Sequence, residues 1–508
     1  MKKRALAIAL TAAMAASMLP MSVFAEEERP EITFLVPEYN AGKSLKNDHA
    51  DEVIAAYEDY TNTTVTIKWG DNGAYNEILG TTLMDSDIPM ILTIQGSLDA
   101  TIVDAANQDT FWDLTDYLDD YPNLSTIAPA VRDNLSVNGM VIGIPRVREL
   151  GRYGMSYRKD WAEKLGFTED PQTPEEVYDM LYAFTYGDPD GNGRDDTYGF
   201  EMTKYTGPFD IVQTWFGCGN GWVENEDGDL IPVFQQPEYK EALDWLRKLY
   251  EEKIMRQDWY EIDTSEWSNG CKKGENGMFV DVMDSGRRIW DYFVNNEVMS
   301  VVDENEYASM VLQGPVNGRT LATSGYNGFY VITTDGAQTE EDLRNCLNFL
   351  DKLNDYDMRL MADYGLEGVT YEINEEGLID QSNFTFESSE TPHLGLNQMV
   401  SYTYDEANTP AFPVAKTDRQ EALEDCYYNR TRPVAISNPA LPFIPSSETY
   451  SNYGAELDDI ITQARTLYII GEIDEEELQS RWDYWASVGG QTLIDEINEL
   501  YHAAQDAE

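Results

Sequence analysis

Cysteine, histidine and basic residues are scarce in this chain of 508 residues. The sequence holds 4 cysteines, 3 histidines and 35 lysines and arginines, against 93 aspartates and glutamates. The histidines form no HExxH motif and no GxSxG elbow occurs, so the signatures of zinc peptidases and of serine hydrolases are missing. The net charge of −58 argues against a basic face that could bind nucleic acid or an anionic membrane.

The four cysteines are far apart in sequence and form no CxxC pair; they are Cys218, Cys271, Cys346 and Cys426. Disulfides are optional for stability in so long a chain, and therefore free buried thiols and a single bridge both remain open. Aromatic residues are abundant, with 11 Trp and 32 Tyr. The negative charge thus belongs to a folded globule and not to a disordered acidic tail.

Residues 1–25 have the features of a secretory signal peptide. A basic cluster at residues 2–4 precedes an apolar run that ends at Ala16, and small residues at Val23 and Ala25 suit signal peptidase. We expect cleavage after Ala25, with an uncleaved anchor as the alternative, and a soluble protein outside the cytoplasm, at the cell surface or in the periplasm. No later run offers about 20 apolar residues for a membrane span, and no lipobox cysteine lies near the cleavage point.

Strand and helix patterns alternate in the first part of the mature chain. Strands are expected at residues 32–36, 65–69 and 90–94, with helices at 50–60 and 75–84. This alternation is typical of βαβ units around a mostly parallel sheet, and it predicts an α/β lobe.

A chain of this length predicts two lobes. A turn at Asn138-Gly139 and then Pro145 indicate a crossing between them, and a strand at 328–333 with a helix at 339–353 predicts a return. The first lobe is therefore expected to span residues 26–147 plus about 300–365. The second, helix-rich lobe is expected to span 148–299 plus about 366–508. Two lobes with several crossings form a clamshell that can enclose a ligand.

The segment from residue 188 to 196, DPDGNGRDD, spaces oxygen ligands as a calcium loop does. Set against the EF-hand loop, the ligands would be Asp188, Asp190, Asn192, the carbonyl of Arg194, and Asp196, with a turn glycine at position 6. A capping box at Thr173-Pro174-Glu175-Glu176 predicts the helix that leads into the loop. Position 12 is Gly199 where a calcium sensor has Glu, which favours a structural site over a switch.

Chance can also produce such a run in a chain so rich in acidic residues, so a solvated Asp/Gly turn is the alternative. Residues 225–229, NEDGD, show this. They also alternate oxygen-bearing residues, but they lie between two apolar strands and lack the turn glycine at the sixth position. We interpret them as a hairpin turn.

Four passages resemble a known family. They read NGMVIGIPR at 138–146, YRKDWAEKLGF at 157–167, DPDGNGRDDTYG at 188–199 together with the helix before it, and YGLEGVTY at 364–371. In these passages the chain is similar to the extracellular solute-binding proteins (family 1) of bacterial carbohydrate ABC importers, in the LipO-like and alginate-oligosaccharide-binding branch.

The resemblance implies an α/β, two-lobed periplasmic-binding-protein fold of type II that closes on a sugar and presents it to membrane permease subunits. It also implies that the five ligands named above hold a structural Ca²⁺ ion. Two features depart from the family, because Thr197 stands where a Glu is usual and the lipid-accepting cysteine is missing. We expect a monomer that binds an oligosaccharide or other small solute and no nucleic acid.

Sugar sites combine stacked aromatic rings with polar side chains. Six residues lie where the predicted strands end or the lobes meet: Tyr39, Gln95, Arg146, Trp215, Asp281 and Tyr326. Tyr39, Trp215 and Asp281 are preferred, although core packing or ordinary surface is the alternative for each.

The competing function is a secreted, calcium-stabilised carbohydrate-active enzyme such as a glycoside hydrolase. Its catalysis would need two carboxylates at a set separation, and the sequence cannot identify such a pair among 93 acidic residues. A calcium-dependent adhesin is a third reading, but no repeats or wall-sorting tail are found. We therefore expect a binding protein without catalytic residues.

Overall fold

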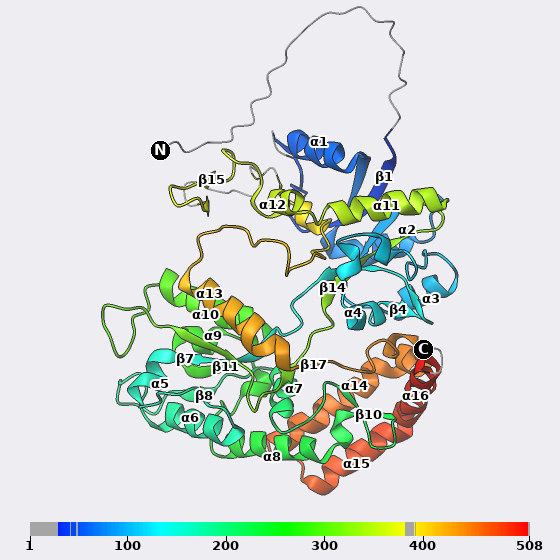
Figure 1. The fold of residues 1–508 in the computed structure, drawn as a ribbon. Coiled ribbons are helices and arrows are strands. Elements are labelled where there is room, and N and C mark those ends of the chain that lie inside the picture. The colour runs from blue at the N-terminus through cyan, green and yellow to red at the C-terminus, as the bar shows by residue number, and fades with distance from the viewer. Residues whose placement is uncertain (1–28, 41, 47–48, 382–390, 392, 506–508) are drawn as a thin grey trace, which may run out of the picture.

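The computed structural model describes residues 29–40, 42–46, 49–381, 391 and 393–505. The expected signal peptide, residues 1–25, lies outside these ranges. The described chain folds into two lobes, each built around its own sheet (Figure 1). No helix in these ranges is both long enough and apolar enough to cross a membrane.

The first lobe has a five-stranded sheet in the order β2-β1-β3-β14-β6. Strand β1 pairs in parallel with β2 and with β3, as the alternating pattern predicts, whereas β14 runs antiparallel to β3 and β6. The lobe contains β1 (Glu31–Glu38), α1 (Ala50–Thr61), β2 (Thr64–Asp71), α2 (Tyr75–Thr82), β3 (Ile91–Ile94), α3 (Ala100–Asn107), α4 (Pro129–Asp133), β4 (Ser136–Val137), β5 (Met140–Val141), β6 (Ile144–Val147), β14 (Tyr326–Ile332), α11 (Glu340–Lys352) and α12 (Tyr356–Tyr364).

Burial along these strands follows their place in the sheet. The central strand β3 is buried at every position, and the edge strand β2 alternates between more and less exposed residues. Continuous apolar runs are expected where helices cover both faces of a strand. Pro145 lies within β6, which is the other edge of the sheet and can tolerate a residue without a backbone N–H.

The second lobe is built on a four-stranded sheet in the order β12-β7-β11-β8. Separate hydrophobic clusters form around this sheet, and the larger one extends to the C-terminal helices. The lobe contains β7 (Tyr153–Arg158), α5 (Lys159–Lys164), α6 (Pro174–Tyr186), β8 (Tyr198–Phe200), α7 (Gly207–Trp215), β9 (Trp222–Glu224), β10 (Leu230–Pro232), α8 (Pro237–Glu251), α9 (Asn269–Lys273), β11 (Asn276–Val282), α10 (Met283–Asn295), β12 (Met310–Gly314), β13 (Thr320–Leu321), α13 (Asp418–Asp425), β17 (Ala435–Ile436), α14 (Glu448–Ile469), α15 (Glu475–Trp485) and α16 (Gln491–Gln505).

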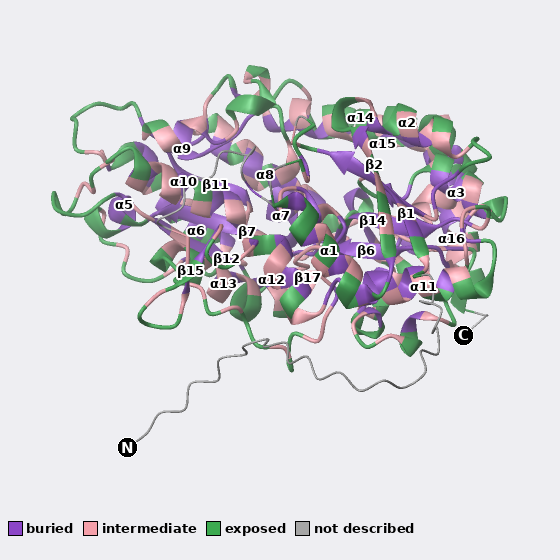
Figure 2. Cartoon of the chain, turned by 90° about the horizontal axis from the view of Figure 1, so that it is seen from above, coloured by how far each residue is buried: buried purple, intermediate pink, exposed green. Residues whose placement is uncertain are grey.

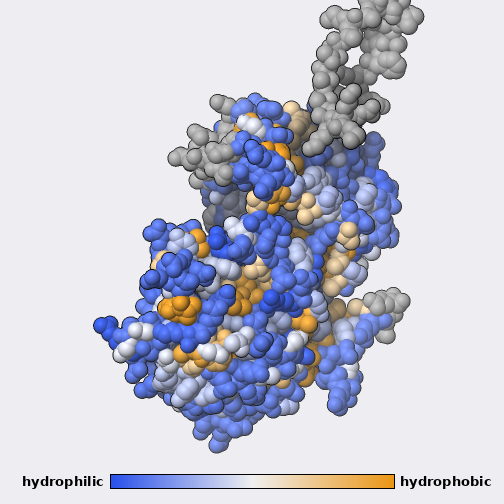
Figure 3. Space-filling view, turned by 60° about the vertical axis from the view of Figure 1, so that its left-hand side comes forward, coloured by the Kyte–Doolittle hydropathy of each residue, from blue (hydrophilic) through white to orange (hydrophobic). Residues whose placement is uncertain are grey.

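Three segments connect the lobes: residues 148–152, 322–325 and 401–417. Helices α14 to α16, orange to red in Figure 1, form an arm of the second lobe that reaches back to the first. There the short helix η10 (Ile444–Ser446) contacts α3. The buried strands of the two sheets form two separate groups in Figure 2, and the face in Figure 3 is mostly hydrophilic with small hydrophobic patches.

Two predicted lobe boundaries differ from this arrangement. The first lobe resumes at Tyr326 and not at about 300, because β12 pairs with β7 and β13 pairs with β17 in the second lobe. The first lobe also continues beyond residue 365, since Leu396, Met399 and Val400 are part of its core. Both differences arise from contacts between residues that are far apart in the sequence.

Candidate functional site

The edges of the two sheets face the crossing segments. In the first lobe, Tyr326 at the start of β14 pairs with Val147 at the end of β6, and Phe329 pairs with Ile94 at the end of β3. The ends of β1, β3 and β6 and the start of β14 therefore share one edge. Four of the predicted ligand residues lie along this edge: Tyr39, Gln95, Arg146 and Tyr326.

Tyr39 and Gln95 contact each other at this edge. The Gln95 side chain donates from Nε2 to Tyr39 Oη (2.7 Å) and to Asn72 Oδ1 (2.8 Å). Tyr39 is 47% exposed, so about half of this residue is accessible to a ligand. A single amide group thus orients the side chains that follow β1 and β2.

Arg146 and Tyr326 are more deeply buried. Arg146 donates from Nη2 to Gln398 Oε1 (2.7 Å), and its Nε has no hydrogen-bond partner among the described residues. Tyr326 donates from its hydroxyl to the carbonyl of Asn134 (3.1 Å). Of the six predicted ligand residues, Tyr326 is the one that lines the main cavity.

Asp281 lies at the corresponding edge of the second sheet, where it pairs with Gly154 next to a crossing segment. Its carboxylate accepts the backbone N–H of Val282 (2.7 Å). Burial raises the pKa of Asp281 to about 6, because a charged carboxylate loses hydration there. The side chain is close to the crossing but does not line the cavity.

Trp215 does not stand where a sugar could stack on it. It is fully buried in the core of the second lobe, with its ring edge-on to Trp245 at 6.0 Å. Trp215 shares a helix face with Ile211 and Val212, which are also buried. This prediction therefore differs from the structure, because the apolar spacing of α7 turns the ring into the core.

A cavity of about 650 Å³ lies between the lobes, within the usual range for small-molecule sites of about 300–1,000 Å³. The first lobe contributes Asn134 and Tyr326, and the second lobe contributes Trp222, Gln213 and Asn438. The crossing segments form part of the wall. Both lobes and the connections between them therefore surround one space.

Trp222 and the nearby Asn220 line the cavity but are not among the six predicted ligand residues. They follow the glycine-rich stretch after α7, in which Gly217 and Gly221 both have positive φ. Asn220 donates from Nδ2 to the carbonyls of Ala322 (3.0 Å) and Ile436 (2.8 Å). The clustered glycines were the available signal, since they allow the chain to turn Trp222 toward the cavity.

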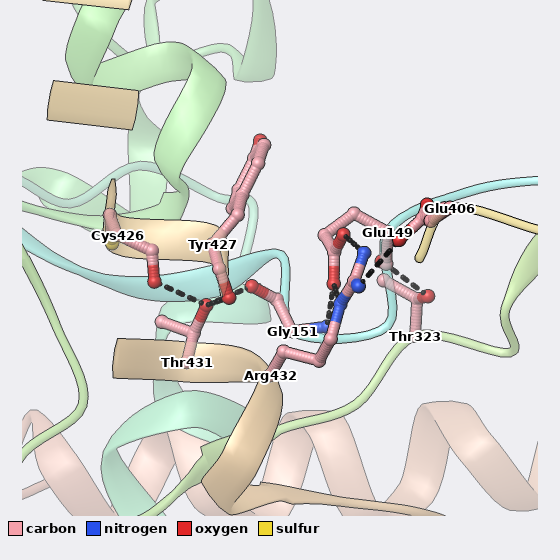
Figure 4. A network of polar contacts seen from close by, with 8 residues as sticks. All are labelled: Glu149, Gly151, Thr323, Glu406, Cys426, Tyr427, Thr431 and Arg432. Carbon is pink, nitrogen blue, oxygen red and sulfur yellow. Dashed lines mark hydrogen bonds and ion pairs between the residues drawn. The ribbon is translucent and has the colours of Figure 1, made fainter. Parts of the chain in front are cut away.

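A polar network joins the three crossing segments (Figure 4). Arg432 donates to both carboxylate oxygens of Glu149, from Nε at 2.8 Å and from Nη2, and it donates from Nη1 to Glu406 at 2.9 Å. Thr323 Oγ1 donates to the carbonyl of Glu149 (3.0 Å). The Arg432 guanidinium group thus connects the first and third crossing segments. The hydrogen bond from Thr323 connects the second crossing segment to the first.

The same network holds Gly151 against the backbone of the second lobe. Thr431 donates from its hydroxyl to the Gly151 carbonyl. A Cβ atom on residue 151 would lie 2.2 Å from the backbone nitrogen of Arg432. Glycine is required at position 151 because the backbone of residues 431–432 approaches it so closely.

The loop predicted to bind calcium lies between α6 and β8, remote from the cavity. The capping box of Thr173 and Glu176 is present at the start of α6, as predicted. Gly193 has a φ of +76°, which an L-residue rarely adopts and which suits the turn position of such a loop. Its backbone N–H donates to both carboxylate oxygens of Asp188, each at 3.2 Å.

The other expected ligands also turn toward one another. The amide nitrogen of Asn192 donates to Asp190 (2.6 Å) and to both carboxylate oxygens of Asp196 (3.1 and 3.3 Å). Two carboxylates thus converge on one donor. In the described chain no three histidine, cysteine or acidic side chains are grouped as a metal site. The three aspartates of the expected set are therefore not gathered as a metal site in this structure, and the calcium site stays a prediction.

The hairpin interpretation of residues 225–229 is confirmed. Strands β9 and β10 pair antiparallel on either side of it, and Asn225 Oδ1 accepts the N–H groups of Asp227 and Asp229. The four cysteines are free and buried, which decides between the alternatives left open above.

Comparison with protein families decides the class of the molecule. The family model described as bacterial extracellular solute-binding protein matches residues 52–356, more than half of the chain. The chain is a member of this family. The predicted family and its two-lobed α/β fold are both confirmed.

Relatives of this solute-binding protein include two from Bacillus subtilis (strain 168). Lipoprotein LipO is 33% identical over 469 residues, which cover 89% of each chain. The polygalacturonan/rhamnogalacturonan-binding protein YtcQ is 28% identical over 458 residues, which cover 90% of this chain and 89% of YtcQ.

Solved structures support the same fold for the solute-binding protein. The Streptococcus pneumoniae ABC-transporter substrate-binding protein FusA, in complex with kestose, matches with a TM-score of 0.61 and 18% identity. The match covers 94% of this chain and all of FusA. An EF-hand mutant of FusA with fructo-nystose matches with a TM-score of 0.59.

Proposed function

We propose that this protein is the substrate-binding component of an ABC importer, which captures an oligosaccharide between its lobes and delivers it to membrane permease subunits. The observation that carries the proposal is the cavity of about 650 Å³ enclosed by both lobes and their crossing segments. A ligand that contacts both walls favours the closed arrangement, because it binds that state more tightly than the open one.

The chemistry of the cavity suits a sugar. Trp222, Tyr153 and Tyr326 supply aromatic surface, and Asn220 and Gln213 supply hydrogen-bonding groups. Sugars present apolar ring faces and hydroxyl edges to such mixed surfaces. The names of YtcQ and FusA favour an oligosaccharide as well, but polygalacturonan is a polyuronate and kestose is neutral, so they leave the charge of the sugar open.

Titration of the mature protein with an oligosaccharide panel tests this function. Isothermal calorimetry should detect binding, and chromatography of the same mixtures should recover every sugar intact. Release of shorter products would support the glycoside hydrolase alternative and reject the receptor. Replacement of Trp222 by Ala should weaken binding, whereas Trp290→Ala, on α10 and outside the cavity lining, serves as an aromatic control.

We also infer a structural calcium site at the loop of residues 188–196. The convergence of Asp190 and Asp196 on Asn192 supports it, and Ca²⁺ would neutralise carboxylates that otherwise repel one another. Chelation should lower the melting temperature, and Asp190→Ala should reproduce that loss and remove the response to calcium. Asp227→Ala in the β9–β10 turn is the matched control. Equal melting with and without calcium would reject the site.

The remaining expectations concern the mature form. We propose that the chain is exported, that it is cleaved after Ala25, and that it acts as a monomer outside the cytoplasm. Mass spectrometry of the secreted protein tests the cleavage point, and light scattering tests the monomer.

A further inference from the structure

Three arginines and two aspartates line the cavity between the lobes, although the protein has a net charge of −58. These five charged side chains are Arg148, Arg152, Arg465, Asp210 and Asp458. A charge inside a partly enclosed space is screened less than one on the surface. The way in which these groups are paired therefore indicates what the cavity can accept.

Both aspartates of the cavity already have donors from the protein. Asp210 accepts from Arg465 Nη1 at 2.5 Å, and Asp458 accepts from the hydroxyl of Tyr450 at 2.9 Å. Arg152 in turn donates from Nε to Asp284 at 2.7 Å. Two of the three arginines are thus neutralised by carboxylates of the protein itself.

Arg148, the third arginine of the cavity, has no such partner in the described part of the chain. Its Nη1 donates to the backbone carbonyl of Val147 (3.0 Å), and no ion pair to it occurs among the described residues. Its backbone N–H donates to the carbonyl of Gly325 (2.9 Å), which fixes it on the first crossing segment. The guanidinium group is half-buried, so it lies at the cavity with several N–H donors unused.

The surroundings of Arg148 are unfavourable for its charge. Burial, followed by the neighbouring guanidinium groups of Arg146 and Arg152, lowers the pKa of Arg148. Arginine stays charged in proteins. Arg146 is bound to the neutral amide of Gln398 and so brings no counter-charge. A half-buried cation beside two others is destabilised until an anion reaches it.

We propose that the captured oligosaccharide contains a uronic acid, and that the guanidinium group of Arg148 binds its carboxylate. This inference rests on the proposed function and specifies its substrate class. One free guanidinium group matches the single charge of a carboxylate, and its planar fork can donate two parallel hydrogen bonds to the two oxygens. Because Arg148 lies on a crossing segment, the contact also connects the ligand to the part of the chain about which the lobes move.

The test uses pairs of oligosaccharides that differ only in charge. Oligouronates from pectin and from alginate are titrated into the mature protein, alongside the same molecules with each carboxyl group reduced to a primary alcohol. The acidic member of at least one pair should bind about 10- to 100-fold more tightly, as expected for charge-assisted hydrogen bonds. Its affinity should fall with added salt.

Variants of Arg148 connect the preference to this residue. Arg148→Gln should remove most of the preference for the acid form, and Arg148→Lys should keep part of it because the charge remains. Arg481→Gln makes the same change of charge on α15, where Arg481 pairs with Glu477 outside the cavity, and should leave binding unchanged. Melting curves of all variants show whether each one folds.

The outcomes separate this inference from the proposed function. Equal or tighter binding of the reduced sugars, or binding of neutral fructo- or malto-oligosaccharides alone, would overturn the uronate inference and leave the receptor function standing. An acid preference that survives in both folded Arg148 variants would overturn the role of this residue. If no saccharide bound, both proposals would fail.

Discussion

Removal of the Arg432 side chain should weaken the connection between the lobes. Arg432 is the one donor that contacts carboxylates on both the first and the third crossing segments within the described chain, at Glu149 and Glu406. Arg432→Met keeps much of the aliphatic stem but removes five N–H donors and the charge. Among the described residues, the Glu149 carboxylate would then keep only the backbone N–H of Gly151 (3.1 Å) as a hydrogen-bond donor.

The expected cost follows from burial. Breaking a fully buried ion pair by removing one partner costs about 3–5 kcal/mol, and an exposed pair is worth about 0–1 kcal/mol. The Glu149 side chain is 12% exposed but that of Arg432 is 36% exposed, so the pair lies between these limits. We expect Arg432→Met to lower the free energy of unfolding by about 1–3 kcal/mol.

Glu406→Gln provides the comparison within the same network. The Glu406 side chain is 49% exposed, so water should replace most of its contact with Arg432. The free energy of unfolding should therefore fall by less than about 1 kcal/mol. Glu149→Gln should cost more than Glu406→Gln, and the double variant of Glu149 and Arg432 should show a coupling energy in a double-mutant cycle.

Urea unfolding, followed by tryptophan fluorescence and by circular dichroism, provides the measurement. Coincident transitions are needed before the free energies can be compared, because two lobes need not unfold together. A loss below about 0.5 kcal/mol for Arg432→Met, or equal losses for the two glutamate variants, would refute the reasoning from burial. In that case the backbone hydrogen bonds of the crossing segments would be what holds the two lobes together.

Two further predictions concern titratable groups. Burial raises the pKa of Asp281 to about 6, so the folded state resists its ionisation and loses stability as the pH rises from the ordinary value of 3.8 through 6. Asp281→Asn should therefore stabilise the protein by up to about 3 kcal/mol at pH 8 and have little effect below about pH 3; a difference that does not change with pH would contradict this. Burial also raises the pKa of the Cys218 and Cys426 thiols to about 12. A thiol reagent should label no cysteine in the native protein and all four after denaturation, and fewer than four would reveal a disulfide.

Local patterns predicted the elements of the fold well, because each element depends on its own sequence. The capping box at Thr173 places the start of α6 at Pro174, and the helices expected at 50–60 and 75–84 are α1 and α2. The lobe boundary near residue 300 was not predictable in this way. The strand β12 has the apolar character of a first-lobe strand, and only its pairing with β7, about 150 residues earlier, assigns it to the second lobe.

The positions of the candidate residues in the fold were predicted best where strand ends determine them. Tyr39, Gln95 and Arg146 share one sheet edge because the carboxyl ends of parallel strands meet there, and Tyr326 joins them at the start of the antiparallel strand β14. Trp215 was selected for its residue type, although Ile211 and Val212 already placed its helix face in the core. The helical period was thus a better guide than the chemistry of the ring.

Arg148 could not be recognised from the sequence, since its significance lies in a missing partner. With 93 acidic and 35 basic residues, composition predicts that every arginine finds a carboxylate. Most described arginines do, including Arg152 four residues later, which reaches Asp284 on α10. Arg148 is held by its backbone on a crossing segment that places its guanidinium group beside two other arginines and toward the cavity. An excess of acidic residues in the sequence is therefore compatible with a cavity that attracts an anion, because the fold determines which charged side chains are paired with one another.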